Sequence, residues 1–92
     1  MRVLAFDTST ERCTVAVLDD GALAAEIDVR ARARHGEVLL DLVDEALARA
    51  RVEKRALELI AVGLGPGSFT GTRVGVATAK GLAVALDRPL VG

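Results

Sequence analysis

Residues 59–75 read Leu59-Ile60-Ala61-Val62-Gly63-Leu64-Gly65-Pro66-Gly67-Ser68-Phe69-Thr70-Gly71-Thr72-Arg73-Val74-Gly75, and this stretch decides the fold of the chain. An apolar run gives way to a Gly-Pro-Gly turn, which is followed by a segment rich in small residues. Pro66 fixes one backbone angle, while Gly65 and Gly67 can adopt the positive φ values that other residues resist. We therefore predict a strand, a helix, and between them a structural turn made by Gly65, Pro66, Gly67 and Ser68. Ser68 or Thr70 is expected to cap the helix, because its first N–H groups need acceptors.

The glycine turn invites comparison with phosphate-binding loops, since a helix N-terminus offers free N–H donors and partial positive charge. A P-loop requires a Lys followed by Ser or Thr after its last glycine, whereas Gly71 is followed by Thr72 and Arg73. A dinucleotide-binding fingerprint requires a third glycine where this chain has Ser68. The spacing favours a structural turn and leaves an anion cradle as the alternative.

Composition limits the function classes that this chain can serve. The 92 residues suffice for one small domain, whose interior must be built from Val, Leu, Ile and Ala because only 2% of residues are aromatic. A net charge of -1 provides no general attraction to nucleic acid or to an anionic membrane. The single cysteine, Cys13, lies in an apolar run and excludes a disulfide framework or a four-cysteine metal site. With no stretch of membrane-spanning length, we expect a cytoplasmic protein without a membrane partner.

The order of elements predicts an α/β fold. Short apolar or β-branched runs indicate strands at residues 2–6, 13–18 and 22–29, and Asp20-Gly21 is a tight-hairpin signal between the last two. A helical period covers residues 37–51, followed by the strand and helix described above and by a short run at residues 90–92. The predicted order is β-β-β-α-β-α-β, an antiparallel meander followed by two crossovers that add parallel strands to the same mixed sheet. Because the last strand is so short, we expect residues 1–92 to be the front part of a longer protein.

Three segments of the chain carry a family pattern. They are Val3-Leu4-Ala5-Phe6-Asp7-Thr8-Ser9-Thr10, His35-Gly36-Glu37-Val38-Leu39-Leu40, and the stretch from Gly63 to Gly75 followed by Ala79-Lys80-Gly81-Leu82. Together they resemble the TsaB (YeaZ) family of bacterial tRNA-modification proteins, and the resemblance extends over essentially the whole chain. The Gly-Pro-Gly-Ser-Phe-Thr-Gly segment is its most specific part. Thr72 departs from the pattern, because the family usually shows a larger aliphatic residue there.

The resemblance implies both a fold and a role. It implies that residues 1–92 form the N-terminal lobe of an actin-like ATPase, or RNase H-like, fold, and that the C-terminal lobe is absent from this chain. It also implies a non-catalytic subunit that supports a TsaD-like transferase in making N6-threonylcarbamoyladenosine in tRNA, together with a TsaE-like ATPase. ATP and metal are then expected on the partner and no cofactor on this chain, and tRNA is contacted through the complex. An older glycoprotease label is not supported by these residues.

The alternative function is a nucleotide-binding actin-like lobe with weak phosphate-binding activity of its own. Asp7, Ser9 and Thr10 are the candidate cofactor-binding residues, because they lie where actin-like ATPases place their first phosphate loop. Such loops usually contain glycine so that the backbone can approach the phosphates, and here Thr8 and Ser9 occupy that place. Asp7 and the hydroxyl groups can equally satisfy a turn between two strands. We therefore assign no catalytic residue and no metal ligand.

The second helix is the basis of the docking hypothesis, because it is apolar nearly all round. One side carries Gly71, Gly75, Val76, Ala79, Leu82 and Ala83, and another carries Val74, Ala77, Gly81, Val84 and Ala85, while Arg73 and Lys80 form a charged stripe. Small residues at every fourth position let a neighbouring helix approach closely. The predicted partner interface is Leu39, Val43, Gly71, Gly75, Val76, Ala79 and Ala83, which would bind the transferase subunit or form a homodimer. The alternative is that this side packs only on the first helix of the same chain.

Overall fold

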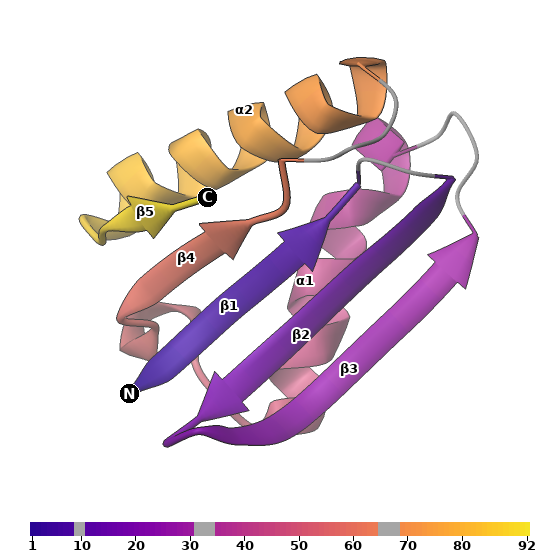
Figure 1. Ribbon diagram of the computed structural model, residues 1–92. Helices are drawn as coiled ribbons and strands as arrows, with labels where there is room; N and C mark the ends of the chain where they lie inside the picture. Colours follow the sequence, from indigo (N-terminus) through magenta and orange to yellow (C-terminus); the bar gives the residue numbers. More distant parts are fainter. Residues whose placement is uncertain (9–10, 31–34, 65–68) are drawn as a thin grey trace.

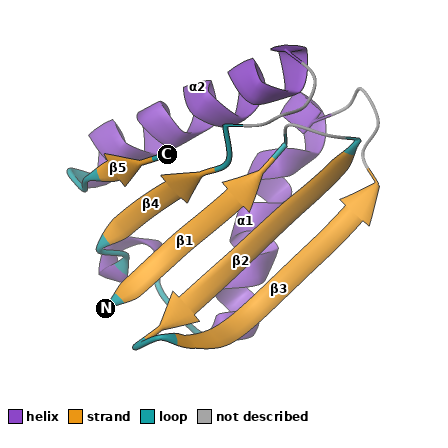
Figure 2. Cartoon of the chain, in the orientation of Figure 1, coloured by secondary structure: helices purple, strands orange, loops and turns teal. Residues whose placement is uncertain are grey.

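The computed structural model describes residues 1–8, 11–30, 35–64 and 69–92, which form one sheet with two helices behind it (Figures 1 and 2). In chain order the elements are β1 (Arg2–Asp7), β2 (Arg12–Asp19), β3 (Ala22–Arg30), α1 (His35–Ala50), a 3-10 turn η1 (Lys54–Ala56), β4 (Leu59–Val62), α2 (Phe69–Leu86) and β5 (Leu90–Val91). The predicted α/β order is confirmed, with η1 as an addition that the sequence did not suggest. The four residues of the predicted turn, Gly65, Pro66, Gly67 and Ser68, lie outside the described residues.

Strand β1 lies at the centre of the sheet, whose order is β3-β2-β1-β4-β5. It pairs antiparallel with β2 and parallel with β4, so that Leu4 lies beside both Val17 and Ile60. The pairing of β4 with β5 is also parallel. This arrangement confirms the predicted meander and the two parallel returns. It also makes both helices begin at the same end of the sheet, where β1 and β4 end (Figure 1).

A tight hairpin joins β2 and β3, as the Asp-Gly signal predicted. Asp20 has φ 53° and Gly21 has φ 81°, and two consecutive positive values are the mark of a type I′ turn, whose twist matches that of the flanking strands. The register of β3 against β2 shifts between Val17 and Leu18. The β2–β3 hairpin therefore forms one edge of the sheet, and the pairing of its two strands is irregular next to the turn.

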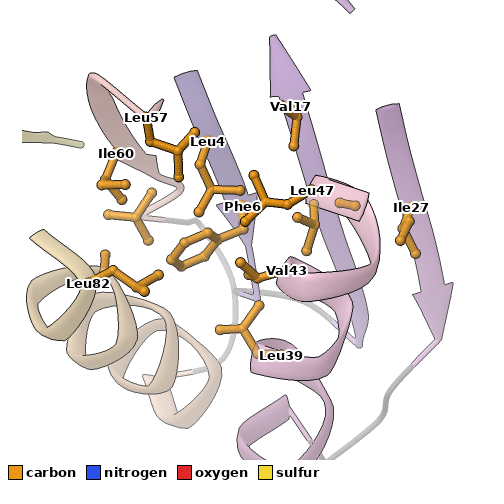
Figure 3. Close-up of a cluster of buried hydrophobic side chains, with 14 of the residues drawn as sticks. Leu4, Phe6, Val17, Ile27, Leu39, Val43, Leu47, Leu57, Ile60 and Leu82 are labelled. Atoms are coloured by element: carbon orange, nitrogen blue, oxygen red, sulfur yellow. The ribbon is translucent and has the colours of Figure 1, made fainter. Parts of the chain in front are cut away.

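The hydrophobic core fills the space between the sheet and the two helices. Leu4 and Phe6 of β1 point into it, and Figure 3 draws Phe6 with Leu82 of α2 and Val43 of α1 on either side. Leu39, Val43, Ala46 and Leu47 of α1 are buried there, as the predicted helical face requires. The opposite face of the sheet carries no helix in the described part of the chain (Figure 1). One face of β1 is thus covered and the other is open.

Both helices end in the same backbone motif. After α1, Val52 N–H donates to Leu47 C=O and Arg51 N–H donates to Ala48 C=O. After α2, Arg88 N–H donates to Ala83 C=O, and Asp87 N–H donates to Val84 C=O. This is the Schellman pattern, in which the residue after the last helical one adopts positive φ; Arg51 has φ 57° and Asp87 has φ 53°.

The start of α2 corrects one prediction. The helix begins at Phe69, so Thr70 lies inside its first turn. A capping residue lies before the first helical residue and has non-helical backbone angles. Thr70 is therefore not the cap, and the alternative, Ser68, lies outside the described residues.

Candidate functional site

The end of β1 packs tightly against two glycines. A Cβ atom added to Gly63 would lie 2.5 Å from both Cγ and Oδ2 of Asp7. A Cβ atom added to Gly75 would lie 2.7 Å from Oγ1 of Thr8 and 3.4 Å from Cγ2 of Val62. Thr8 is fully buried and Asp7 is half-buried. The glycines thus let β4 and α2 approach β1 where its polar side chains begin.

A hollow of about 360 Å³ opens beside Asp7 on the helix-free face of the sheet. It is lined by Ala5, Phe6, Asp7, Thr14, Ala16, Ala61, Val62, Gly63 and Gly92. Among these residues Asp7 supplies the one charge, a negative one, and the walls are mostly apolar. A phosphate group would meet like charge here and no cation among the lining residues, so this donor set does not fit a nucleotide phosphate.

The structure does not locate the other two candidate cofactor-binding residues. Ser9 and Thr10 lie outside the described residues. Across residues 1–8, 11–30, 35–64 and 69–92, no three His, Cys, Asp or Glu side chains gather closely enough to hold a metal ion. A tightly held divalent cation needs several oxygen ligands, whereas the hollow beside Asp7 offers one carboxylate.

The predicted partner interface is corrected at four positions. Leu39, Val43 and Ala79 are at most 1% exposed, and Gly75 is buried against Thr8. The small-residue side of α2 rests on the chain's own sheet, because small residues let a helix lie close to β1 and β4. These four residues therefore cannot contact a partner in the folded chain. Two other predicted residues, Val76 and Ala83, are half-buried at the margin of this contact, and Gly71 lies in the first turn of α2.

The side of α2 that faces away from the sheet is the one with Ala77, Gly81 and Val84. Val84 is 82% exposed, and on α1 Leu40 is 53% exposed. We define the outer helix surface as the exposed residues Leu40, Asp41, Asp44, Glu45, Arg73, Ala77, Lys80 and Val84. On α1 the helical period contained the signal for this surface, because Asp41 projects opposite to the apolar face of that helix. The α2 residues of the interface predicted from the sequence lie on the other side of this helix.

The outer helix surface is divided by charge between the two helices. Arg73 and Lys80 are the only charged residues in the sequence of α2. On α1 the exposed charges include Asp41, Asp44 and Glu45. Asp44 forms an ion pair with Lys54 at 2.9 Å, and Glu45 forms one with Arg49 at 3.3 Å. The surface thus presents a basic helix beside an acidic one.

A shallow hollow of about 350 Å³ follows the basic flank of α2. Thr72, Arg73, Val76, Ala77 and Lys80 line it. Arg73 and Lys80 lie beside the apolar side chains of Val76 and Ala77. This arrangement suits an acidic side chain of a protein partner, whose carboxylate could pair with the two cations.

Cys13 takes no part in either region. Its side chain is fully buried in the core, as expected from its apolar run, and the thiol is free. Burial raises the pKa of the Cys13 thiol, because the thiolate would lose its hydration. A thiol in this state is chemically inert at neutral pH.

Comparison with known proteins gives the family. The family described as "TsaD: tRNA N6-adenosine threonylcarbamoyltransferase" matches residues 29–92. Superposition on the solved structure of YeaZ from Pseudomonas aeruginosa gives a TM-score of 0.92 at 40% identity, over 99% of this chain and 43% of that one. This chain belongs to the TsaD/TsaB (YeaZ) family. It has the fold of YeaZ, in agreement with the actin-like, RNase H-like architecture that the motifs implied.

Two family members show how the chain relates to its longer relatives. The tRNA threonylcarbamoyladenosine biosynthesis protein TsaB of Escherichia coli is 39% identical over 92 residues, which is all of this chain and 39% of that protein. The tRNA N6-adenosine threonylcarbamoyltransferase of an Anaeromyxobacter species is 36% identical over 107 aligned positions, covering 99% of this chain and 32% of that protein. The chain therefore spans about two fifths of the TsaB relative. The alignment with the transferase is longer than the chain itself, so that relative carries additional residues within the matched region.

One further property concerns membranes. Within the described ranges, neither helix of this family member combines the length and the apolar character needed to cross a bilayer.

Proposed function

We propose that this chain is a non-catalytic subunit that supports a TsaD-type transferase in the formation of N6-threonylcarbamoyladenosine in tRNA. The observation that carries the proposal is the donor set at the end of β1, where Asp7 is the one charged side chain among the described lining residues of a mostly apolar hollow. Such a site is poorly suited to hold a nucleotide phosphate. The chemistry is therefore assigned to the partner, which would supply the ATP and metal sites.

The comparison between relatives supports the same division of labour. The alignment with the TsaB relative is 92 positions long, the same number as the residues of this chain, whereas the alignment with the transferase relative is 107 positions long for nearly the same segment. The additional residues of the transferase have no counterpart in this chain. We infer that they belong to functions which the transferase performs and this subunit does not.

The outer helix surface is the proposed docking site for the transferase subunit. Val84 and Leu40 expose apolar area that a second helix pair would cover, and exposed aliphatic groups of this kind gain roughly 1.5–3 kcal/mol on full burial. A TsaE-like ATPase would join the resulting complex in the cytoplasm. Since the chain has a net charge of -1, we assign tRNA binding to the complex rather than to this chain.

A binding titration against the transferase subunit tests the docking site. Val84→Glu places a charge at the centre of the proposed contact, and we expect at least about a tenfold loss of affinity, or 1.4 kcal/mol. Leu23→Glu is the matched control, because Leu23 is 57% exposed on β3, away from the helices. Equal affinities for Val84→Glu and Leu23→Glu would move the docking site elsewhere.

The second candidate function is nucleotide binding by this chain itself, and the position of Asp7 beside a hollow favours it. The proposed subunit role predicts that the chain releases no phosphate from ATP above background and cleaves no peptide. A steady release that disappears in Asp7→Ala, with the circular dichroism spectrum unchanged, would establish the ATPase alternative instead.

A further inference from the structure

We infer that the outer edge of β3 binds an extended basic segment of another protein, which joins the sheet as a further strand beside residues 25–29. The segment alternates Lys or Arg with aliphatic residues. The inference concerns the edge of the sheet rather than the outer helix surface, so it does not depend on the proposed function. It is argued from the length of this edge, the exposure of Val29 and the charge of Glu26.

Strand β3 is a long, open edge. In the order β3-β2-β1-β4-β5 it has β2 on one side, and the described residues place no strand on the other (Figure 1). Its 9 residues include no proline, so each carries a backbone N–H, whereas the opposite edge strand, β5, has 2 residues. On an edge strand the N–H and C=O groups that point away from the sheet can pair with an incoming strand.

The part of this edge beyond the hairpin turn is regular. The register against β2 shifts between Val17 and Leu18, so the irregular pairing is confined to the residues next to the turn. From Ala25 to Val29 each residue pairs with one residue of β2 in unbroken order. Such a stretch extends about 17 Å, which is the usual length of a strand in a globular protein.

Val29 is the apolar residue that an added strand would cover. Ile27 and Val29 lie on the helix-covered face, because the β2 residues opposite them, Val15 and Cys13, are fully buried. Ile27 is 6% exposed, whereas Val29 is 37% exposed on the same face. A strand outside β3 would place an aliphatic side chain beside Val29 and bury it.

Glu26 gives the edge a negative charge that is not matched within the described part of the chain. On the same face Asp28 Oδ1 lies 2.9 Å from Arg12 Nε. Arg30 Nε lies 3.9 Å from Glu11 Oε2. Glu26 is exposed between these pairs and the hairpin, and it forms no ion pair with a described residue. Opposite charges on adjacent strands attract, so a Lys or Arg on the incoming strand would pair with Glu26.

The same charges disfavour a second copy of this chain as the occupant. Two β3 edges related by a two-fold axis run antiparallel, and centring the pair on Ile27 places Glu26 of each copy opposite Asp28 of the other. Like charges directly opposite each other destabilise a strand pair. The charge pattern therefore favours a basic segment over another β3.

A peptide titration tests the inference. The probe is a fluorescently labelled acetyl-Thr-Lys-Val-Lys-Val-Lys-Thr-amide, and its matched control carries Glu in place of each Lys. We expect saturable binding of the Lys peptide to the parent chain, with a dissociation constant below about 1 mM. The Glu peptide should bind at least about tenfold more weakly. Fluorescence anisotropy at low salt measures both.

A charge reversal at the edge tests the role of Glu26. Glu26→Lys should weaken binding of the Lys peptide at least about tenfold, because it places like charges on adjacent strands. Glu53→Lys is the matched control, since it changes the net charge equally and Glu53 precedes η1 and pairs with Arg55. It should leave the affinity within about twofold of the parent. Circular dichroism confirms that both variants are folded.

Amide hydrogen exchange locates the bound peptide. In the free chain the outward-facing amides of β3 should exchange faster than those bonded to β2, and the Lys peptide should slow them. The inference is overturned if the Lys peptide does not bind, if the two peptides bind equally, or if Glu53→Lys weakens binding as much as Glu26→Lys. Protection of amides outside β3 instead would also overturn it. Binding of the transferase subunit is a separate titration, and neither result decides the other.

Discussion

The two faces of the sheet are built from alternate residues of the same strands and differ in nearly every property. On the covered face Leu4, Phe6 and Ile60 are at most 3% exposed and pack against both helices. On the open face their neighbours Ala5 and Ala61 are half-buried and line a hollow. The difference shows that the covered face supplies the core packing that stabilises the fold, while the open face has small side chains that leave a hollow unfilled. Variants on either side of one strand can separate these roles.

Truncation on the covered face should have the largest effect. Phe6→Ala removes the ring that lies between the helices, and we expect a loss of about 3–5 kcal/mol in the free energy of unfolding. Val3→Ala in the same strand, on the open face and half-buried, is the control and should cost under about 1.5 kcal/mol. Urea denaturation measures both. Similar losses would mean that the two faces contribute equally to stability.

Overpacking beneath α2 should have the next effect. Gly75→Leu forces a side chain against Thr8 and Val62, and we expect a destabilisation of about 1–3 kcal/mol or more. Gly81→Leu is the matched control on the far side of α2, where an added Cβ meets nothing within 4 Å. It should stabilise the chain by up to about 1 kcal/mol, because Leu is the better helix former. Melting temperatures that move in the same direction for the two variants would contradict the orientation of α2.

An added methyl group at the edge of the open face should be tolerated better. The Cβ of Gly63→Ala would meet mainly the carboxyl end of Asp7, which can turn into the adjacent hollow. We expect a cost near the lower limit for overpacking, about 1 kcal/mol. A loss as large as that of Gly75→Leu, measured in the same urea titration, would show that Asp7 is held rigidly.

The smallest effect is expected at the hairpin, outside both faces. The hydrogen bond between the Met1 amine and Asp20 raises the pKa of the amine above 8.0 and lowers the pKa of Asp20 below 3.8. The stabilisation from this pair is lost when Asp20 is protonated, as the pH falls through its lowered pKa. It is also lost when the Met1 amine is deprotonated, as the pH rises through its raised pKa. Asp20→Asn should therefore lower the melting temperature slightly near neutral pH. The difference from the parent should shrink in acid, as the pH falls below 3.8, and in alkali, as the pH rises above 8.0. A constant difference would exclude the ion pair as its cause.

Much of the fold followed from local patterns, whereas the orientation of α2 did not. The Asp20-Gly21 hairpin and the buried face of α1 were predictable, because turn chemistry and helical period act over a few residues. Helix α2 has glycines on two sides, and the sequence alone does not tell whether the side with Gly75 or the side with Gly81 packs on the sheet. Only the contact of Gly75 with Thr8 decides which side meets the sheet. The α2 side predicted from the sequence to contact a partner therefore includes Gly75 and Ala79, which the structure buries against the sheet.

The exposed face of β1 was also beyond the sequence. A continuous apolar run such as residues 2–6 is typical of a strand covered on both faces, yet in the described residues both helices lie on one side of the sheet. Apolar content indicates that a strand is central and does not say how many layers cover it. The same limit applies to Asp7. Its position, where actin-like ATPases place their first phosphate loop, made it a candidate cofactor-binding residue, but the sequence does not show the mostly apolar lining of the hollow beside it.

The Schellman motif that ends both helices contains backbone strain that a substitution could relieve. Arg51 and Asp87 adopt positive φ, a conformation that costs a residue with a side chain roughly 1 kcal/mol and costs glycine nothing. Arg51→Gly and Asp87→Gly should each recover part of that strain without altering either face of the sheet. A chain carrying both replacements would be a tolerant background in which costly core substitutions stay folded long enough for their binding to be measured.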